Sequence, residues 1–551
     1  MPVNGRMRRI LMNLGILLVL SGVPAFPQKP EPPREQAGGS AYIPIDSWIY
    51  ATLDRLAALG LIPSQTSGLR PWTRTECKRQ LVEAEGRLAH SDARLNTEAT
   101  RLVGELRRGL DAAPFAIDSV YLREGIIAGP ALTDSFHFGQ TWTNYSGRPF
   151  GQGWNTYDGF AGHAEWNRFF AFVDGEYQHA PAISPYPLSV RQTLAELDEI
   201  PLQPAAAGSS TNRFRALDTY IGARFGDFEF SVGKQTLFWG PTADSPLSFG
   251  DNAEPTKNFR ASTVHPIPLP GPLHHFGEVR AEFVLGKLGG QRYTWRPWFN
   301  AQKITFKLAE DIEVGFTRWS ILWGAGHPMT IGSFTRNLTS VNSRDDDFGR
   351  LDPGDRKGGF DFRLRVPGLR NWLTLYSDSY CDDDPSPLAA PSRAAITPGI
   401  YLARVPGVSH LDLRVEAPST KPMEGDMGGT FIYWNSQYKS GNTNYGYLIG
   451  NAAGRDARVI DARATYWFSA KNKFSAEYRD LKGGSTFLPG GMTQNDGSLR
   501  GSFYVSGAWS VDIFVQYERF WVPLLGGPMR NLSSLVQLTC TPPSLQFGKT
   551  H

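Results

Sequence analysis

From about Ile117 onward, apolar and polar residues alternate in short segments, the pattern of β-strands with two unlike faces. The clearest segment begins with Phe228, Phe230 and Val232, which share one face, while the residues between them are polar. Gly226 and Asp227 precede it as a tight turn. This stretch predicts an antiparallel hairpin with one apolar and one polar face.

The same alternation recurs along the rest of the chain. Further segments begin at Phe160, Ile304, Phe360, Leu411 and Val511. A soluble β-sandwich alternates in the same way, so alternation alone does not decide the fold class.

The lengths of the connections separate the two classes. Short connections at 226–227, 310–311, 367–371, 406–410 and 469–472 alternate with long ones near 181–216, 240–276, 323–357, 377–398 and 481–498. Outer-membrane barrels place short turns on the periplasmic side and long loops outside, and closure leaves no unpaired strand edge in lipid. We therefore predict an all-β transmembrane barrel over residues 114–547, with roughly 18 to 20 antiparallel strands, where an even number is expected.

Residues 42–113 have a helical period instead. An N-cap at position 46 or 47 begins the first predicted helix, and a capping box of Thr73 and Glu76 begins the second. The third covers about 97–110. We expect the apolar stripes to pack on one another as a small periplasmic helical bundle. A groove for a partner is the alternative.

The chain begins with a secretory signal pattern. Three arginines among the first nine residues precede an apolar run over 10–20 and small residues at 23–25. We predict a signal peptide over 1–25 and a Pro-rich linker over 26–41. The apolar run is too short to span a bilayer.

Charge and cysteine content exclude several classes of protein. The formal net charge is +3, from 56 Lys and Arg against 53 Asp and Glu. Removing residues 1–25, which hold three arginines and no acid, leaves 53 against 53. Nucleic acid requires a clustered basic face, so we expect no nucleic-acid partner. The three cysteines are widely spaced and fit no metal or redox motif.

Four spaced motifs resemble the central signature of the Wzi-type capsule-assembly family of outer-membrane proteins. They are Gly233-Lys234-Gln235, Trp239-Gly240-Pro241, Pro246-Leu247 and Asn252-Ala253-Glu254-Pro255. The resemblance covers about 42–541 and implies a barrel of roughly 18 strands with a periplasmic helical bundle. It also implies a lectin-like protein that binds capsular or related extracellular polysaccharide and tethers it at the cell surface.

A second, partial resemblance lies in the helical region. The segments Tyr42 to Tyr50, Leu56 to Gly60 and Arg70 to Arg74 resemble one envelope-anchoring S-layer-homology module. This resemblance implies a periplasmic envelope partner, in addition to the outer-membrane lipid that a barrel requires.

Motifs for catalysis are missing from the sequence. It has no G-x-S-x-G elbow, no H-E-x-x-H and no phosphate-binding G-x-x-x-x-G-K-[ST]. We expect a protein that is not an enzyme and that uses no cofactor or metal. The acidic runs at 345–347 and 382–384 are solvated loop charge, or alternatively hold a divalent cation that bridges an acidic glycan.

Sugar recognition needs flat aromatic faces and polar groups for hydroxyls and acids. A loop expected at 240–276 supplies Asn252, Lys257, Asn258 and Arg260, and Trp239 stands beside it at the rim. These five are the predicted polysaccharide-binding residues. Trp239 is alternatively part of the aromatic girdle, and Arg260 alternatively pairs with a carboxylate in the lumen. At the level of function, the alternatives are an outer-membrane porin or sugar channel and, third, an outer-membrane hydrolase.

Overall fold

The computed structural model describes residues 38–89, 93–205, 208–269, 271–339, 354–382, 387–424 and 428–542. The predicted signal peptide and most of the predicted linker lie outside the described residues. Within them, the chain forms a closed antiparallel barrel of 18 strands, in which each strand pairs with the next along the chain and β1 pairs with β21 to close the wall. The predicted fold class is therefore confirmed, including an even number of strands.

The wall consists of β1 (Phe115–Ile127), β2 (Gly153–Trp166), β3 (Phe169–Ala180), β4 (Thr211–Phe225), β5 (Phe228–Gln235), β6 (Thr256–Thr263), β8 (Glu278–Lys287), β9 (Trp298–Ala309), β10 (Ile312–Leu322), β11 (Asp355–Arg365), β12 (Leu373–Asp382), β13 (Ala395–Leu402), β14 (Leu411–Glu416), β17 (Ala457–Trp467), β18 (Lys473–Gly483), β19 (Met492–Ser506), β20 (Trp509–Trp521) and β21 (Met529–Cys540). The two-residue strand β7 (Ile267–Pro268) pairs with β8, and β15 (Thr443–Asn444) and β16 (Tyr447–Leu448) form a separate hairpin.

Alternation along each strand sends apolar side chains outward and polar side chains into the lumen. On β5, Phe228, Phe230 and Val232 are exposed, whereas Glu229 and Ser231 are buried. On β20, exposed tryptophans stand at both ends, with Ile513 and Val515 exposed between them. An apolar band between two aromatic rims is the outer surface expected of a barrel in lipid.

The predicted short turns are confirmed, but the strands extend into the predicted long loops. The clearest correction concerns 240–276, which is not one loop, because β6 crosses the membrane from Thr256 to Thr263. Only Phe259 and Ala261 are apolar on its outward face, so its alternation is hard to detect in the sequence. Other strands continue beyond the edge of the lipid into segments predicted as loops. An apolar outer face is not required there, so alternation does not mark these strand ends.

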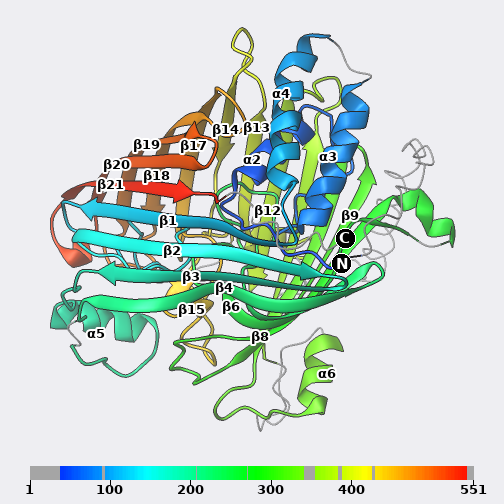
Figure 1. The fold of residues 1–551 in the computed structure, drawn as a ribbon. Helices are drawn as coiled ribbons and strands as arrows, with labels where there is room; N and C mark the ends of the chain where they lie inside the picture. The colour runs from blue at the N-terminus through cyan, green and yellow to red at the C-terminus, as the bar shows by residue number, and fades with distance from the viewer. Residues whose placement is uncertain are drawn as a thin grey trace.

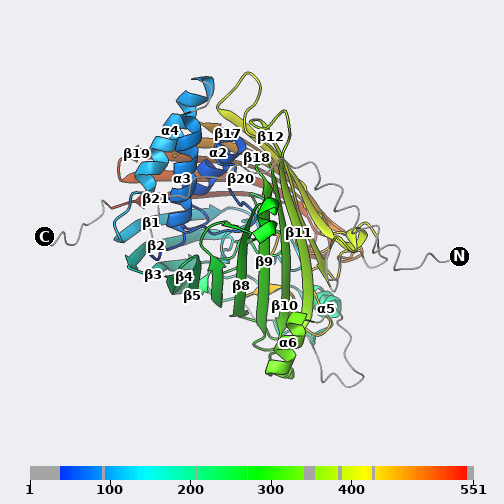
Figure 2. The ribbon, with the colours of Figure 1, turned by 90° about the vertical axis from the view of Figure 1, so that its right-hand side faces the viewer.

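Three helices lie at the short-turn end of the barrel, opposite α5 (Leu188–Leu197) and α6 (Ile331–Thr339) in the long loops (Figures 1 and 2). They are α2 (Trp48–Ala58), α3 (Arg74–Leu88) and α4 (Ala93–Leu110). Ser47 caps α2 and Thr73 caps α3, accepting the backbone N–H of Glu76. Among the described residues, no helix is both long enough and apolar enough to span a membrane.

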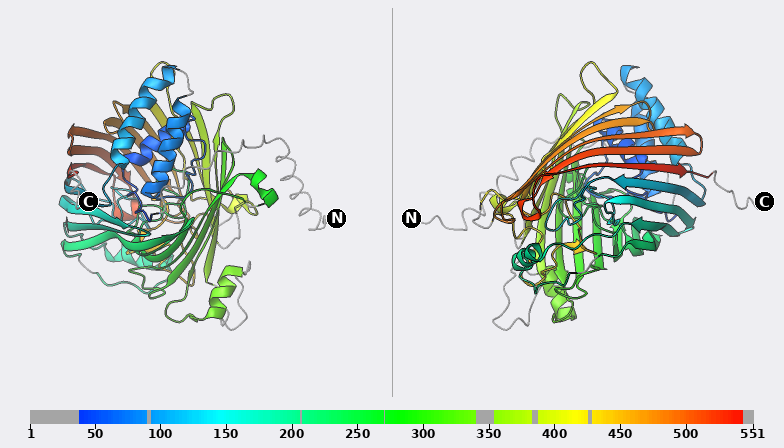
Figure 3. Two further views of the ribbon diagram at one scale, coloured as in Figure 1. Left: turned by 45° about the vertical axis from the view of Figure 1, so that its right-hand side comes forward. Right: turned by 90° about the vertical axis from the view of Figure 1, so that its left-hand side faces the viewer.

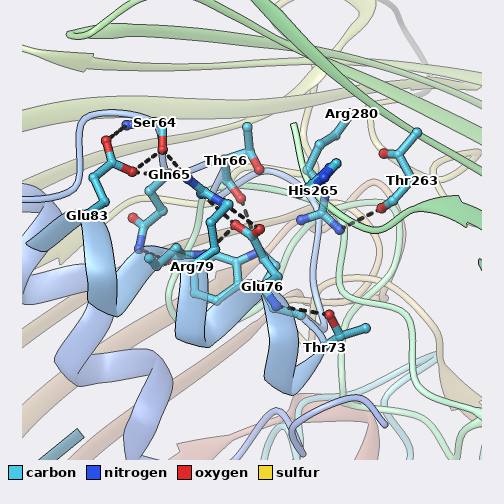
Figure 4. Close-up of polar contacts among 12 residues, drawn as sticks. Ser64, Gln65, Thr66, Thr73, Glu76, Arg79, Glu83, Thr263, His265 and Arg280 are labelled. Carbon is cyan, nitrogen blue, oxygen red and sulfur yellow. Dashed lines mark hydrogen bonds and ion pairs between the residues drawn. The ribbon is translucent and has the colours of Figure 1, made fainter. Parts of the chain in front are cut away.

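The helices share their apolar core with the barrel rather than packing only on one another. Leu53, Leu81 and Leu102, one from each helix, lie in one buried cluster with Trp467 and Ala470, which come from the end of β17 and the turn after it. Figure 3 shows the helices, in blue, against this end of the strands. Polar contacts join α3 to the chain that precedes it. Arg79 donates to Glu76, Glu83 and the Ser64 hydroxyl (Figure 4).

The chain between α2 and α3, residues 59–73, enters the lumen, and we call it the inner segment. Glu313 on β10 accepts hydrogen bonds from the backbone N–H groups of Ser67, at 3.0 Å, and Gly68, at 2.7 Å. Deeper in the barrel, Arg70 exchanges two backbone hydrogen bonds with Phe238. The inner segment thus connects the helices to the middle of the barrel.

Candidate functional site

Two of the long loops fold into the lumen, and together we call them the outer plug. They are residues 236–255 and the described parts of a later loop, 417–424 and 428–456. Trp239 and Phe249 from the first share one buried apolar cluster with Tyr433 from the second and with Leu69 of the inner segment. The ring centroids of Trp239 and Phe249 lie 4.9 Å apart. The outer plug and the inner segment therefore meet inside the barrel.

Trp239 and Arg260, two of the predicted sugar-binding residues, lie at this meeting point. Both side chains are fully buried. The Trp239 indole N–H donates to Glu282 Oε1 at 3.1 Å, and the Arg260 guanidinium pairs with Glu282 Oε2 at 2.5 Å. The girdle interpretation of Trp239 is wrong, because a girdle ring must face lipid, whereas the pairing of Arg260 with a lumen carboxylate is confirmed.

The other three predicted residues do not converge on one surface. Asn252 holds the loops together, accepting from the Asn144 N–H at 3.2 Å and donating to the Leu448 carbonyl at 3.1 Å. Asn258 is buried on β6, whereas Lys257, its neighbour, is exposed on the outer wall. The structure does not bring the five residues together, and their binding of sugar stays a prediction.

A different concave surface opens among the long loops, and we call it the surface pocket. It has a volume of about 370 Å³ and is formed by the loops 128–152 and 181–210. Its lining includes Asp134, His137, Tyr186, Arg191, Asp198 and Gln203. Ser184 and Pro185 at its edge are exposed, so the pocket is open to solvent on the long-loop side. Ligand sites in proteins are usually concave and of roughly this size or larger.

A network of charged side chains forms the floor of the surface pocket. His137 bridges Asp134 and Asp198, with each nitrogen-to-oxygen distance 2.7 Å. Asp198 also accepts from Arg455 at 2.7 Å, and Arg455 lies over the ring of Phe487 at 4.2 Å. Four separate loops are joined by these contacts, which keeps the floor in one geometry.

The charges of this floor are maintained across the physiological pH range. Burial alone would lower the pKa of His137, but the carboxylates of Asp134 and Asp198 raise it to about 10. Burial would raise the pKa of Asp198, but His137 and Arg455 hold it below its ordinary value. The imidazole therefore stays protonated and the carboxylate ionised, so no proton has to move when a ligand binds.

Above this floor, the surface pocket combines apolar and polar groups. Tyr186 packs edge-on against Phe138, with ring centroids 5.5 Å apart. Arg191 donates to the Gln203 backbone carbonyl at 2.7 Å. This contact joins α5 to the chain that follows it in the same loop. An aromatic face beside a guanidinium, an amide and carboxylates is the combination that sugar rings and hydroxyl groups require.

The sequence does not predict the surface pocket. Residues 181–216 were expected to be a long loop, whereas the structure has α5 within them and β4 from Thr211. Val190, Leu194 and Leu197 stand four and three residues apart, which is a helical signal that could have shown α5. No comparable signal links Asp134 to Asp198 and Arg455, because those residues meet only through the fold.

In the parts of the chain that the structure covers, no three His, Cys, Asp or Glu side chains are grouped so as to hold a metal ion. The acidic run at 345–347 lies outside the described residues, as do positions 383 and 384 of the second run.

Together, the closed barrel, its apolar band and its alternation of short turns and long loops define an outer-membrane β-barrel protein with a filled lumen. Comparison with known proteins identifies the family. Residues 122–529 match the family model of capsule assembly protein Wzi. The chain belongs to this family, and it is an outer-membrane protein.

Two known proteins show how far the similarity extends. A solved structure of Wzi, described as an outer-membrane carbohydrate-binding β-barrel involved in group 1 capsule assembly in Escherichia coli, has a TM-score of 0.68. It covers 92% of this chain and 100% of that one at 16% identity, which supports the fold. An uncharacterized 55.8 kDa protein in the cps region of Klebsiella pneumoniae is 25% identical over 217 residues. That match spans 39% of this chain and 42% of the relative.

Proposed function

We propose that this protein binds capsular or related extracellular polysaccharide at the cell surface and tethers it there, without catalysing a reaction. Membership of the capsule-assembly family supports this proposal, as does the description of the similar structure as carbohydrate-binding. The observation that carries it in this chain is the surface pocket, which presents Tyr186 over a floor of fixed charges on the long-loop side.

The geometry favours binding over transport. Binding a polymer at the surface needs an open, rigid site on the outside, and the floor of the surface pocket is joined by four loops. Transport needs a continuous aqueous path, whereas the outer plug and the inner segment share an apolar cluster inside the barrel. We therefore place the first contact with polysaccharide at the surface pocket and not at the buried residues Trp239 and Arg260.

The test is the substitution Tyr186→Ala. Aromatic contacts are worth about 0.5–1.5 kcal/mol beyond the area they bury, so affinity for the purified surface polysaccharide of the source organism should fall about two- to tenfold. Tyr177→Ala is the matched control, because Tyr177 is exposed on the outer wall of β3 and outside the pocket. Binding can be measured by titration of the detergent-solubilised protein.

Tethering requires a second measurement in cells. A deletion strain should release polysaccharide into the medium while making the same total amount, and the Tyr186→Ala gene should restore retention only in part. Equal binding by Tyr186→Ala and wild type would remove the surface pocket from the proposal. Unchanged cell-bound polysaccharide in the deletion strain would overturn tethering itself.

A further inference from the structure

Two lysines stand side by side on the outer wall of the barrel, at the long-loop end. Lys257 is the second residue of β6 and Lys287 is the last residue of β8, and the two are direct partners in the register of these strands. Both are exposed. Alternation places them on the same outward face as Phe259 and Leu285, one pair further toward the membrane centre.

The two ammonium groups of this lysine pair repel each other. Like charges directly opposite each other on neighbouring strands destabilise a sheet. Lys234, the partner of Lys257 on β5, pairs with Glu254, but among the described residues no ion pair of Lys257 or Lys287 with a carboxylate is found. An anion bound between the two ammonium groups would replace repulsion with two attractive contacts.

Aromatic side chains surround the pair. Trp298, which pairs with Lys287 in the register, lies under the Lys287 ammonium group at 4.6 Å. In the connection 288–297 just beyond the strands, Trp295 is exposed and lies under the guanidinium of Arg296 at 4.1 Å. Tryptophan and lysine gather at the level of lipid headgroups, because one end of each side chain prefers hydrocarbon and the other prefers water.

The position of the two lysines along the membrane normal determines which ligand can reach them. Below Lys287, the outward residues of β8 are Val279, Ala281, Phe283 and Leu285, which form an apolar run through the hydrocarbon. The lysines therefore stand at the upper edge of the apolar band, on the side of the long loops and so of the outer leaflet. An anion fixed to a lipid in that leaflet reaches this height, whereas an extended polymer above the loops does not.

We propose that Lys257 and Lys287, together with Trp298 and Arg296, form a binding site for the phosphorylated headgroup of the outer-leaflet glycolipid, lipid A. A phosphate bridges the two ammonium groups, and the sugar rings of the headgroup lie along the two tryptophans. The acyl chains continue down the wall over Phe259 and Leu285. This site lies outside the barrel and is separate from the surface pocket.

The test uses the full-length protein in detergent, titrated with bisphosphorylated lipid A and followed by native mass spectrometry. Lys257→Glu with Lys287→Glu should weaken lipid A binding about tenfold or more, because two attractive charges become repulsive. Lys257→Gln with Lys287→Gln, which removes the charge with less risk to insertion, should weaken it by a smaller factor. Wild type should bind dephosphorylated lipid A no better than the glutamine variant binds the bisphosphorylated form.

Lys482→Glu is the matched control. Lys482 is also exposed at the long-loop end, on β18, but it has Asp480 beside it at 3.7 Å. Its substitution should leave lipid A binding unchanged. The proposal is overturned if the glutamine variant keeps the wild-type affinity, if Lys482→Glu weakens binding equally, or if removing the phosphates has no effect. Polysaccharide binding is measured on the same variants in a separate titration, so that failure of this proposal and failure of the proposed function are distinguishable.

Discussion

At the residue scale, the period of two along a strand decides what each side chain can do. Lys257 and Arg260 are three positions apart on β6, so they face opposite sides of the wall. Arg260 is buried against Glu282 and lies over the ring of Tyr42 at 4.1 Å. A pair of cations that looks like one binding site in the sequence is therefore two unrelated sites in the barrel.

The first prediction at this scale concerns pH and His137. Because the folded pKa is raised to about 10, above the ordinary value of about 6.5, protonated His137 stabilises the loops below about pH 6.5. That contribution is lost as the pH rises toward 10. The hydrogen-exchange protection factors of residues 188–197 in α5, which correct for the base-catalysed intrinsic rate, should fall over this range in the wild type.

His137→Gln provides the comparison. Glutamine cannot carry the charge, so Asp134 and Asp198 lose a charge-assisted contact worth about 1.5–3 kcal/mol. The protection factors of the variant should already be low at neutral pH and should change little on going to pH 10. A variant with the same pH dependence as the wild type would show that another group is responsible.

At the element scale, the inner segment is held by the wall as well as by the helices. Its backbone N–H groups at Ser67 and Gly68 have the Glu313 carboxylate as their acceptor, and Arg363 donates to Gln65 at 3.0 Å. Buried backbone donors need acceptors, and here a strand side chain supplies them. The helices and the barrel should therefore lose structure together.

Glu313→Ala tests this coupling. It leaves two buried N–H groups without an acceptor, at about 1–3 kcal/mol each. The temperature at which the compact, unheated form disappears on a detergent gel should fall, and protease should cleave within 59–73. Glu313→Gln keeps an acceptor oxygen and should lie between the alanine variant and wild type. Full stability of Glu313→Ala would show that water or another side chain replaces the carboxylate.

At the scale of the whole molecule, the barrel is a closed wall around a filled interior. The outer plug enters from the long-loop side and the inner segment from the short-turn side, and the two share a buried cluster. Pairs such as Lys303 and Asp361 line the wall around them. The wall resembles that of a pore, but the interior is packed like a protein core.

Conductance measurements test this interior. In planar bilayers the wild type should conduct far less than an open pore of similar strand number. Replacing residues 428–456 with a short flexible linker should open an ion path, because Tyr433 and its neighbours leave the lumen. Shortening 184–204, which lies at the mouth and contributes nothing to that cluster, is the control and should not raise conductance. Open-pore conductance in the wild type would restore the channel alternative.

The sequence by itself determined the local structure. Alternation and the asymmetry between short and long connections were sufficient for an antiparallel outer-membrane barrel, because lipid requires an apolar outer face along nearly every strand. Capping residues were sufficient to predict where α2 and α3 begin, because Ser47 and Thr73 accept hydrogen bonds from neighbouring backbone N–H groups. The predictions failed at β6, where only Phe259 and Ala261 are apolar on the outward face, and at α5, which lies in a loop outside the lipid.

Only the tertiary structure decided which residues lie together inside the barrel and at its mouth. His137 meets Asp198 across 61 residues, and Asp198 meets Arg455 across 257. The outer plug folds into the lumen because its aromatic residues pack in a buried apolar cluster there. Such contacts depend on how the closed wall brings distant loops together, and no period or spacing along the chain encodes that arrangement.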